Sequence, residues 1–387
     1  MNYRKILRPW VWISAAILVT MACSTLSLAP TAMPHPTETN PGLELFADST
    51  VAQIPGSTAG AGIAATETAA TGPATDPIIF TNPKKYRVEY SVTVTNGGFT
   101  LTDLQVYQPR PVEWDGQKNV VVETVSPKSV QATTDPVYGN GLYYWHLLNT
   151  PARGKQQTFT IRFTFTASQT ETNVNADRLS PYDQQSPLYK LYTRSERFIE
   201  SSDYVIVNLA DQIAGGETNP YRQAKKFYDY VVDNAHYRHV GRGLLGAKAL
   251  LTNGEGECGE FASLFIALAR AKGIPARPVV GYWAVSGLEQ THVWAEFYLE
   301  GIGWIPADPT VGQSQPSRNG IPDFYFGNMD NQRVILNKGF NIPMAPPAPD
   351  GFEAALLQGP AWWYWGTDGD GNSVSMDRTS WVVTSIE

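Results

Sequence analysis

GEGECGEFASLFIALARAKGIP, residues 254–275, places a cysteine where a glycine-rich turn passes into a helix. After Cys258, apolar residues recur at the spacing of an amphipathic helix with one buried face, at Phe261, Leu264, Phe265, Leu268 and Ala269. Gly273 and Pro275 end the pattern in the order that helix C-termini favour. Cys258 is therefore expected at a helix N-terminus, where unpaired backbone amides stabilise a thiolate and can donate to an oxyanion.

Two further residues with acyl-transfer chemistry follow downstream. Residues 291–299 read THVWAEFYL and have the two-residue period of a β-strand, which puts His292 on one face with the other even-numbered residues. A short connection then leads to a segment that ends at Asp308, and an antiparallel hairpin would bring that segment back beside the first strand. Asp308 is therefore expected near His292. A cysteine, a histidine base and a carboxylate that orients the base are the groups of nucleophilic acyl transfer.

Five pieces of this region together resemble the transglutaminase-like superfamily of papain-like folds. They match in order and spacing, and they are GECGEFA (256–262), ARAKGIPAR (269–277), GY (281–282), HVWAE (292–296) and GWIPADPT (303–310). The resemblance covers residues 185–312 and implies an α+β catalytic domain, a papain-like core whose cysteine-bearing helix packs on an antiparallel sheet. It implies a cysteine peptidase or acyltransferase, with Cys258 as nucleophile, His292 as base and Asp308 as orienting carboxylate.

The surroundings of the cysteine leave alternatives open. The backbone amide of Cys258 is the first expected oxyanion donor. Tyr237 matches a tyrosine that precedes the nucleophile in many members of the resembled family, and it either lines the site as the second donor or packs beneath it. Glu257 and Glu260 oppose a thiolate by their charge, yet acids in a first helical turn also suit the helix dipole. The sequence does not decide between these two effects.

Residues 1–23 are predicted to be an export signal. A positively charged start precedes a short apolar segment, and the MAC sequence that ends at Cys23 resembles a lipobox, with Thr20 where leucine is usual. We therefore expect a lipoprotein anchored to the membrane on the extracytoplasmic side; secretion after ordinary signal cleavage and an uncleaved transmembrane anchor are the alternatives. With Cys23 acylated, Cys258 is the remaining thiol. Residues 24–76, rich in Thr, Ala, Pro and Gly, are predicted to be a disordered tether.

Residues 77–170 have the pattern of several short strands separated by prolines and glycines. The segment 86–94 alternates in period two and is followed by an Asn-Gly-Gly turn that begins at Asn96. This pattern favours a β-sandwich of the immunoglobulin-like type. His146, which follows three aromatic residues, is interpreted as a strand histidine among packing side chains rather than a ligand contact.

Residues 313–387 are predicted to be a β-rich C-terminal extension. It contains the aromatic run 361–365 and then the acidic turn 367–372, whose oxygen spacing resembles the start of a calcium loop. Because the glycine and glutamate that such loops need at their sixth and twelfth positions are absent, we expect instead a hairpin that joins 362–365 to 379–383. The tryptophans are interpreted as core residues, with stacking on a sugar or peptide as the alternative.

Composition narrows the function. The chain has 387 residues, 17% of them charged, and a net charge of -7, and it carries no basic patch or stripe, so no nucleic-acid partner is expected. His236 and His239 have a metal-like spacing, but no cluster of Cys, Asp or Glu completes a site, so we expect no metal and no cofactor. The favoured function is hydrolysis of peptide or protein amides outside the cell, cell-wall peptide included. Protein crosslinking with the same triad and a binding protein with an idle site are the alternatives.

Overall fold

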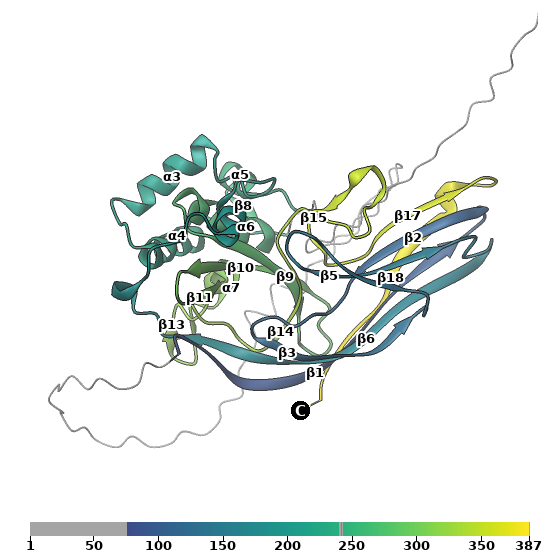
Figure 1. The fold of residues 1–387 in the computed structure, drawn as a ribbon, viewed down its shortest axis with the longest axis horizontal. Coiled ribbons are helices and arrows are strands. Elements are labelled where there is room, and N and C mark those ends of the chain that lie inside the picture. Colours follow the sequence, from purple (N-terminus) through teal and green to yellow (C-terminus); the bar gives the residue numbers. More distant parts are fainter. Residues whose placement is uncertain (1–75, 240, 242, 387) are drawn as a thin grey trace, which may run out of the picture.

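The structure is a computed structural model that describes residues 76–239, 241 and 243–386 (Figure 1). The predicted signal and all but the last residue of the predicted tether lie outside these residues. The described chain is α+β, as predicted, with helices gathered at one end of the molecule and long antiparallel strands at the other. None of its described helices is long and apolar enough to cross a membrane.

The core of the helical part is one helix packed on a four-stranded antiparallel sheet with the strand order β11-β10-β9-β14. The predicted helix start at the cysteine and the predicted hairpin between His292 and Asp308 are both confirmed, and a further strand, β14, completes the sheet beside β9. The elements are α6 (Cys258–Ala271), β9 (Ala276–Trp283), β10 (Thr291–Leu299), β11 (Gly303–Ala307) and β14 (Arg333–Lys338).

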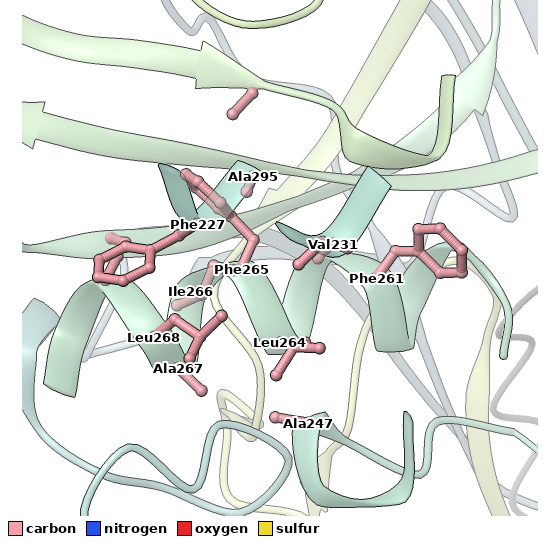
Figure 2. Close-up of a cluster of buried hydrophobic side chains, with 14 of the residues drawn as sticks. Phe227, Val231, Ala247, Phe261, Leu264, Phe265, Ile266, Ala267, Leu268 and Ala295 are labelled. Atoms are coloured by element: carbon pink, nitrogen blue, oxygen red, sulfur yellow. The ribbon is translucent and has the colours of Figure 1, made fainter. Parts of the chain in front are cut away.

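Helix α6 is buried on all sides, so the prediction of a single buried face is wrong in extent. Every residue of α6 except Ala271 is buried. The sheet covers one side, while α4 (Pro220–Asn234) and α5 (Ala247–Asn253) pack against others, as Figure 2 shows for Phe227, Val231 and Ala247. The sequence pattern reports which faces are apolar, but the small residues between them become buried only because neighbouring helices approach closely.

The remaining helices surround the same core. Asn219 caps α4 through a side chain that accepts from the Tyr221 and Arg222 amides. A further helix, Tyr204–Ala214, buries only the narrow stripe Ile206, Ala210 and Ala214. The further elements here are α2 (Pro187–Thr193), α3 (Tyr204–Ala214), α7 (Pro309–Ser314), β7 (His236–Tyr237), β8 (Glu255–Gly256), β12 (Ser317–Arg318) and β13 (Ile321–Pro322).

The long strands form two antiparallel sheets with the orders β18-β1-β6-β3 and β17-β2-β5-β4. Side chains from both sheets, among them Val88, Phe163, Leu104 and Trp145, share one apolar core, so the sheets pack face to face as a sandwich. The immunoglobulin-like type remains a prediction. The strands are β1 (Ile78–Asn96), β2 (Leu101–Pro109), β3 (Gln117–Ser126), β4 (Gln131–Thr134), β5 (Gly141–Leu147), β6 (Lys155–Thr172), β17 (Ala361–Gly366) and β18 (Val374–Ser385).

The C-terminal strands correct the hairpin prediction. β17 pairs with β2 in one sheet and β18 pairs with β1 in the other, so the two strands do not pair with each other. Trp362 on β17 and Trp381 on β18 both lie in the sandwich core. Each strand satisfies the open edge of a different sheet, and the acidic turn 367–372 crosses between them. Two small strands, β15 (Ile342–Pro343) and β16 (Glu353–Ala354), precede them.

Side-chain amides of the sandwich pair with β14, the edge strand of the other sheet. Gln117 Nε2 donates to the Ile335 carbonyl at 3.0 Å, and its Oε1 accepts from the Ile335 amide at 2.8 Å. Asn140 makes the same two contacts with Lys338, at 2.8 and 2.7 Å. The two amides replace a neighbouring strand and fix where β14 lies.

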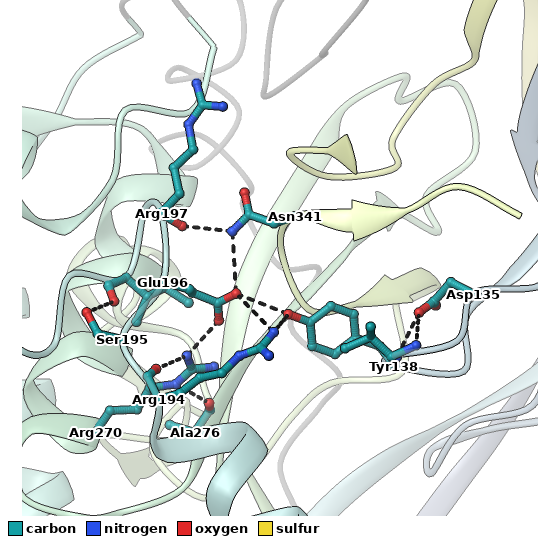
Figure 3. Close-up of polar contacts among 11 residues, drawn as sticks. Asp135, Tyr138, Arg194, Ser195, Glu196, Arg197, Arg270, Ala276 and Asn341 are labelled. Carbon is teal, nitrogen blue, oxygen red and sulfur yellow. Dashed lines mark hydrogen bonds and ion pairs between the residues drawn. The ribbon is translucent and has the colours of Figure 1, made fainter. Parts of the chain in front are cut away.

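A second contact between the two parts is an ion-pair network at the far end of α6 (Figure 3). Arg270 Nη1 lies 2.6 Å from Glu196 Oε1, and the arginine side chain is fully buried. Glu196 Oε2 accepts from the Tyr138 hydroxyl of the sandwich at 3.0 Å, and Asn341 also donates to it. Because a buried charge is costly without a partner, this network ties the helix to the sandwich.

Candidate active site

Cys258 is the first residue of α6, and its side chain is buried, with 1% of the residue exposed. Glu257 and Glu260 form a capping box, in which Glu260 Oε2 accepts from the Glu257 amide at 2.9 Å. Their other oxygens accept from the Gly241 amide at 2.9 Å and the Leu245 amide at 2.7 Å. Burial raises the pKa of Glu260. The two acids therefore serve as caps that hold the start of the helix and the loop around it.

The chain path brings His292 to the end of the sheet where α6 begins. Helix α6 and strand β9 have 14 and 8 residues and are joined by a short turn, so β9 leads back along the helix. At about 1.5 Å per helical residue and 3.3 Å per strand residue, the two elements are similar in length. His292 pairs with Gly281 near the end of β9. Gly281 is required there, because a Cβ would lie 1.8 Å from the Val334 carbonyl oxygen of β14.

The side chains of β10 alternate between two environments. Val293 and Ala295 pack in the same apolar cluster as Cys258. His292 alternates with them and stacks on Trp283, with ring centroids 5.0 Å apart, and on Trp294, with centroids 6.0 Å apart. The imidazole is therefore packed against two aromatic rings, and 5% of the His292 residue is exposed.

His292 and Asp308 lie together, as the predicted hairpin requires. His292 Nε2 is 2.7 Å from Asp308 Oδ2, and Asp308 is fully buried. Asp308 Oδ1 accepts from the Val311 amide at 3.0 Å and so caps α7. Burial alone raises the pKa of Asp308, but His292 and the Arg333 guanidinium outweigh burial and lower that pKa to about 2. An ionised Asp308 makes Nε2 the donor, so Nδ1 is the ring nitrogen that can accept a proton.

Arg333 is the residue of this cluster that the sequence analysis missed. Its Nη1 lies 2.8 Å from Asp308 Oδ2, and its Nη2 lies 3.1 Å from Asp330 Oδ2. The arginine begins the strand sequence RVILNK, all of which is buried. A charged residue at the start of an apolar strand indicates a buried partner, although this pattern does not say which one.

The structure also places the other candidate residues of the sequence analysis. Tyr237 pairs with Gly256 in the parallel β7–β8 contact, two residues before the cysteine, and its ring is 6.4 Å from that of Phe261. His239 Nδ1 lies 3.1 Å from Glu257 Oε1, and no group of three metal-type ligands occurs among the described residues. His146 lies on β5 of the sandwich, and its Nε2 is 2.9 Å from Asp103 Oδ2.

Comparison with known proteins agrees with this architecture. The family model of the transglutaminase-like superfamily matches residues 207–309. An uncharacterised protein of Haemophilus influenzae is 33% identical over 183 residues, covering 38% of this chain and 49% of that protein. YebA, an uncharacterised protein of Bacillus subtilis, is 25% identical over 201 residues, covering 38% of this chain and 27% of YebA. The chain thus spans half or less of the length of these two relatives.

Among solved structures, a candidate cysteine protease from Cytophaga hutchinsonii is similar in fold. The TM-score is 0.55 at 17% sequence identity, and the match covers 80% of this chain and 93% of that one. This likeness extends beyond the helix-on-sheet core to most of the described chain. The residues that match the family model contain both the cysteine at the start of α6 and the hairpin that leads from His292 to Asp308. Residues 207–309 therefore form a domain of the transglutaminase-like superfamily.

Proposed function

We propose that the protein is a cysteine-dependent amide hydrolase that acts through Cys258, His292 and Asp308. The observation that carries the proposal is the buried His292–Asp308 hydrogen bond, at 2.7 Å, at the end of the sheet where α6 begins with Cys258. The pairing of Cys258 with His292 is the step that the proposal adds. The peptidase assignment of a structural neighbour concerns that protein, and it supports this reaction class by fold only.

The proposed chemistry proceeds through a thioester. His292 Nδ1 takes the proton of Cys258, and the sulfur attacks an amide carbonyl carbon, whose oxygen becomes an oxyanion near the α6 amides. His292 gives the proton to the leaving amine as the C–N bond breaks. A water molecule then attacks the thioester and gives a proton to His292, and His292 returns that proton to the sulfur as the C–S bond breaks, which releases a carboxylic acid and regenerates the thiol. Asp308 holds the imidazole tautomer and stabilises the imidazolium throughout.

Two alternatives use the same residues differently. In a crosslinking acyltransferase, an amine rather than water resolves the thioester, and the three groups are identical. In a binding protein with an idle site, the fold would remain while Cys258 would not react. The presence of Cys258, His292 and Asp308 together favours an active site over an idle one, because an idle site would be free to lose any of the three. A substrate screen of peptide and cell-wall amides, with and without added amine, separates hydrolysis from transfer.

Thiol reactivity tests the proposal before any substrate is known. We expect the wild-type protein to react with a small disulfide reagent at pH values well below the free-cysteine pKa of about 8.5, and His292→Ala to lose this reactivity. The pH dependence of the labelling rate at Cys258 is the measurement. His146→Ala, which removes the exposed histidine of the sandwich, is the matched control and should leave the profile unchanged. Slow labelling that ignores His292 would rule out an activated pair.

We further propose that the protein acts on the extracytoplasmic side of a membrane, anchored by a lipid on Cys23. The support is the sequence of residues 1–23, which lie outside the described residues. We expect the wild type to incorporate radiolabelled palmitate and to sediment with membranes, and Cys23→Ser to do neither. Cys258→Ser is the control that should keep the label. Wild-type protein without label would contradict the proposal.

A further inference from the structure

Arg333 is held in a cage that the catalytic pair shares. Its guanidinium carbon lies 4.4 Å from the ring centroid of Trp283, 5.0 Å from that of Trp294 and 5.7 Å from that of Tyr325. Trp283 and Trp294 are also the two rings on which His292 stacks. The arginine side chain is 4% exposed, so these aromatic faces and two carboxylates replace its water.

The same carboxylate oxygen accepts from both the imidazole and the guanidinium. Asp308 Oδ2 lies 2.7 Å from His292 Nε2 and 2.8 Å from Arg333 Nη1, while Oδ1 accepts from the Val311 amide. Three donors therefore fix the rotamer of this carboxylate. One arm of the guanidinium contacts Asp308 and the other contacts Asp330. Arg333 therefore does not take up both oxygens of Asp308, as a bidentate pair would, and His292 keeps its acceptor.

We propose that Arg333 is a positioning residue of the active site, which holds the Asp308 carboxylate ionised and oriented towards His292. This inference rests on the proposed function, in which His292 is the base. Asp308 is fully buried, and an isolated buried carboxylate would take up a proton rather than remain charged. A protonated Asp308 could no longer stabilise the imidazolium of His292. The arginine therefore sets the lowest pH at which the His292–Asp308 pair can act.

The sandwich fixes the arginine in turn. Gln117 clamps both the amide and the carbonyl of Ile335, two residues after Arg333 on β14. The distance from Arg333 to the catalytic pair therefore depends on the docking of the sandwich as well as on the sheet. Other titratable groups that act on Asp308 or its partners are Asp330 and Tyr325 before β14, Arg318 on β12 and Tyr228 on α4.

The test is the pH profile of His292-dependent labelling of Cys258, measured with 2,2′-dipyridyl disulfide on the full chain. The acid limb of this profile is the pH range over which the labelling rate falls as the solution becomes more acidic. In the wild type, Arg333 keeps Asp308 ionised throughout the measured range. Arg333→Met fills the aromatic cage without charge, and we expect the acid limb of the labelling profile to move up by about one pH unit or more. Arg333→Lys, which keeps the charge, should return the limb towards the wild-type position. A folded Arg333→Met with the wild-type limb would overturn the inference.

A matched control separates charge loss at this place from charge loss in general. Arg277 is also buried, stacks 3.7 Å from the Trp304 centroid and pairs with Glu296, but it does not touch Asp308. Arg277→Met should leave the acid limb unchanged even where it lowers stability. A limb that moves equally in Arg277→Met and Arg333→Met would show a general structural effect and overturn the inference.

A second variant decides the matter if Arg333→Met does not fold. Asp330→Asn removes the competing carboxylate from Arg333 and keeps an oxygen for the neighbouring donors, so the arginine charge is left to Asp308. The acid limb should then stay in place or move to lower pH, and an upward shift would overturn the inference. Wild-type protein without His292-dependent labelling would instead refute the proposed function, and this inference with it.

Discussion

Asp308→Asn is expected to reduce the rate of amide hydrolysis by about 10³–10⁴-fold, on the scale known for the loss of an orienting carboxylate in a catalytic triad. An asparagine that turns its amide group to His292 donates to Nε2, so the imidazole proton moves to Nδ1. The base then presents a proton where it must accept one. The asparagine oxygen can still accept from the Val311 amide, so α7 keeps its cap. Arg333 loses its acceptor at residue 308 but keeps the carboxylate of Asp330, so the fold should persist with lower stability.

The rate is measured with the substrate that the amide screen identifies, beside the labelling rate of Cys258 near neutral pH. Asp103→Asn is the matched control, because Asp103 pairs with His146 Nε2 at 2.9 Å in the same manner but at an exposed site of the sandwich. Asp103→Asn should leave both rates unchanged. Equal rates for Asp308→Asn and the wild type would show that Asp308 takes no part in the reaction.

Glu296→Gln is expected to lower the free energy of unfolding by about 3–5 kcal/mol, the usual cost of removing one partner from a buried ion pair. Glu296 lies 2.9 Å from Lys338 Nζ and 2.8 Å from Arg277 Nη2, and all three residues are buried. The glutamine keeps the shape of the side chain but leaves two buried cations without a counter-charge. Denaturant unfolding followed by tryptophan fluorescence gives the free energy.

The destabilisation by Glu296→Gln should also depend on pH, because Lys338 titrates in an accessible range. Burial and the neighbouring Arg277 lower the pKa of Lys338 to about 8, against the attraction of Glu296. Since the folded-state pKa lies below the unfolded value, the cost of the charged lysine is complete below the folded pKa and falls as pH rises towards the unfolded pKa. The deficit of Glu296→Gln relative to the wild type should therefore be smaller at pH 9 than at pH 7. An equal deficit at both pH values would exclude Lys338 as its source.

An exposed ion pair provides the control. Arg87 and Glu123 lie 3.0 Å apart on the outer face of the sandwich, with 47% and 30% of their side chains exposed. Glu123→Gln should change the free energy of unfolding by less than about 1 kcal/mol, because water screens the charges in both states. A Glu296→Gln effect as small as that of Glu123→Gln would contradict the buried-pair argument.

The sequence by itself determined the local elements that carry the proposed catalytic residues. The helix start at Cys258, the strand that carries His292 and the hairpin towards Asp308 all depend on short-range features: residue periodicity, caps and a short turn. Such features act over a few residues and are legible without knowledge of the rest of the chain. The roles of the three residues remain proposals that the labelling and rate measurements test.

Tertiary structure alone decided what surrounds those elements. Arg333 reaches Asp308 only because β14 pairs with β9 at the edge of the sheet, and the sequence pattern of a strand does not name its neighbour. Strands β17 and β18 join separate sheets for the same reason, which is why the expected hairpin was wrong. Pairing partners and complete burial of α6 depend on which distant surfaces exclude water together. That choice is made by the summed packing of the whole chain, since no single segment contains the information.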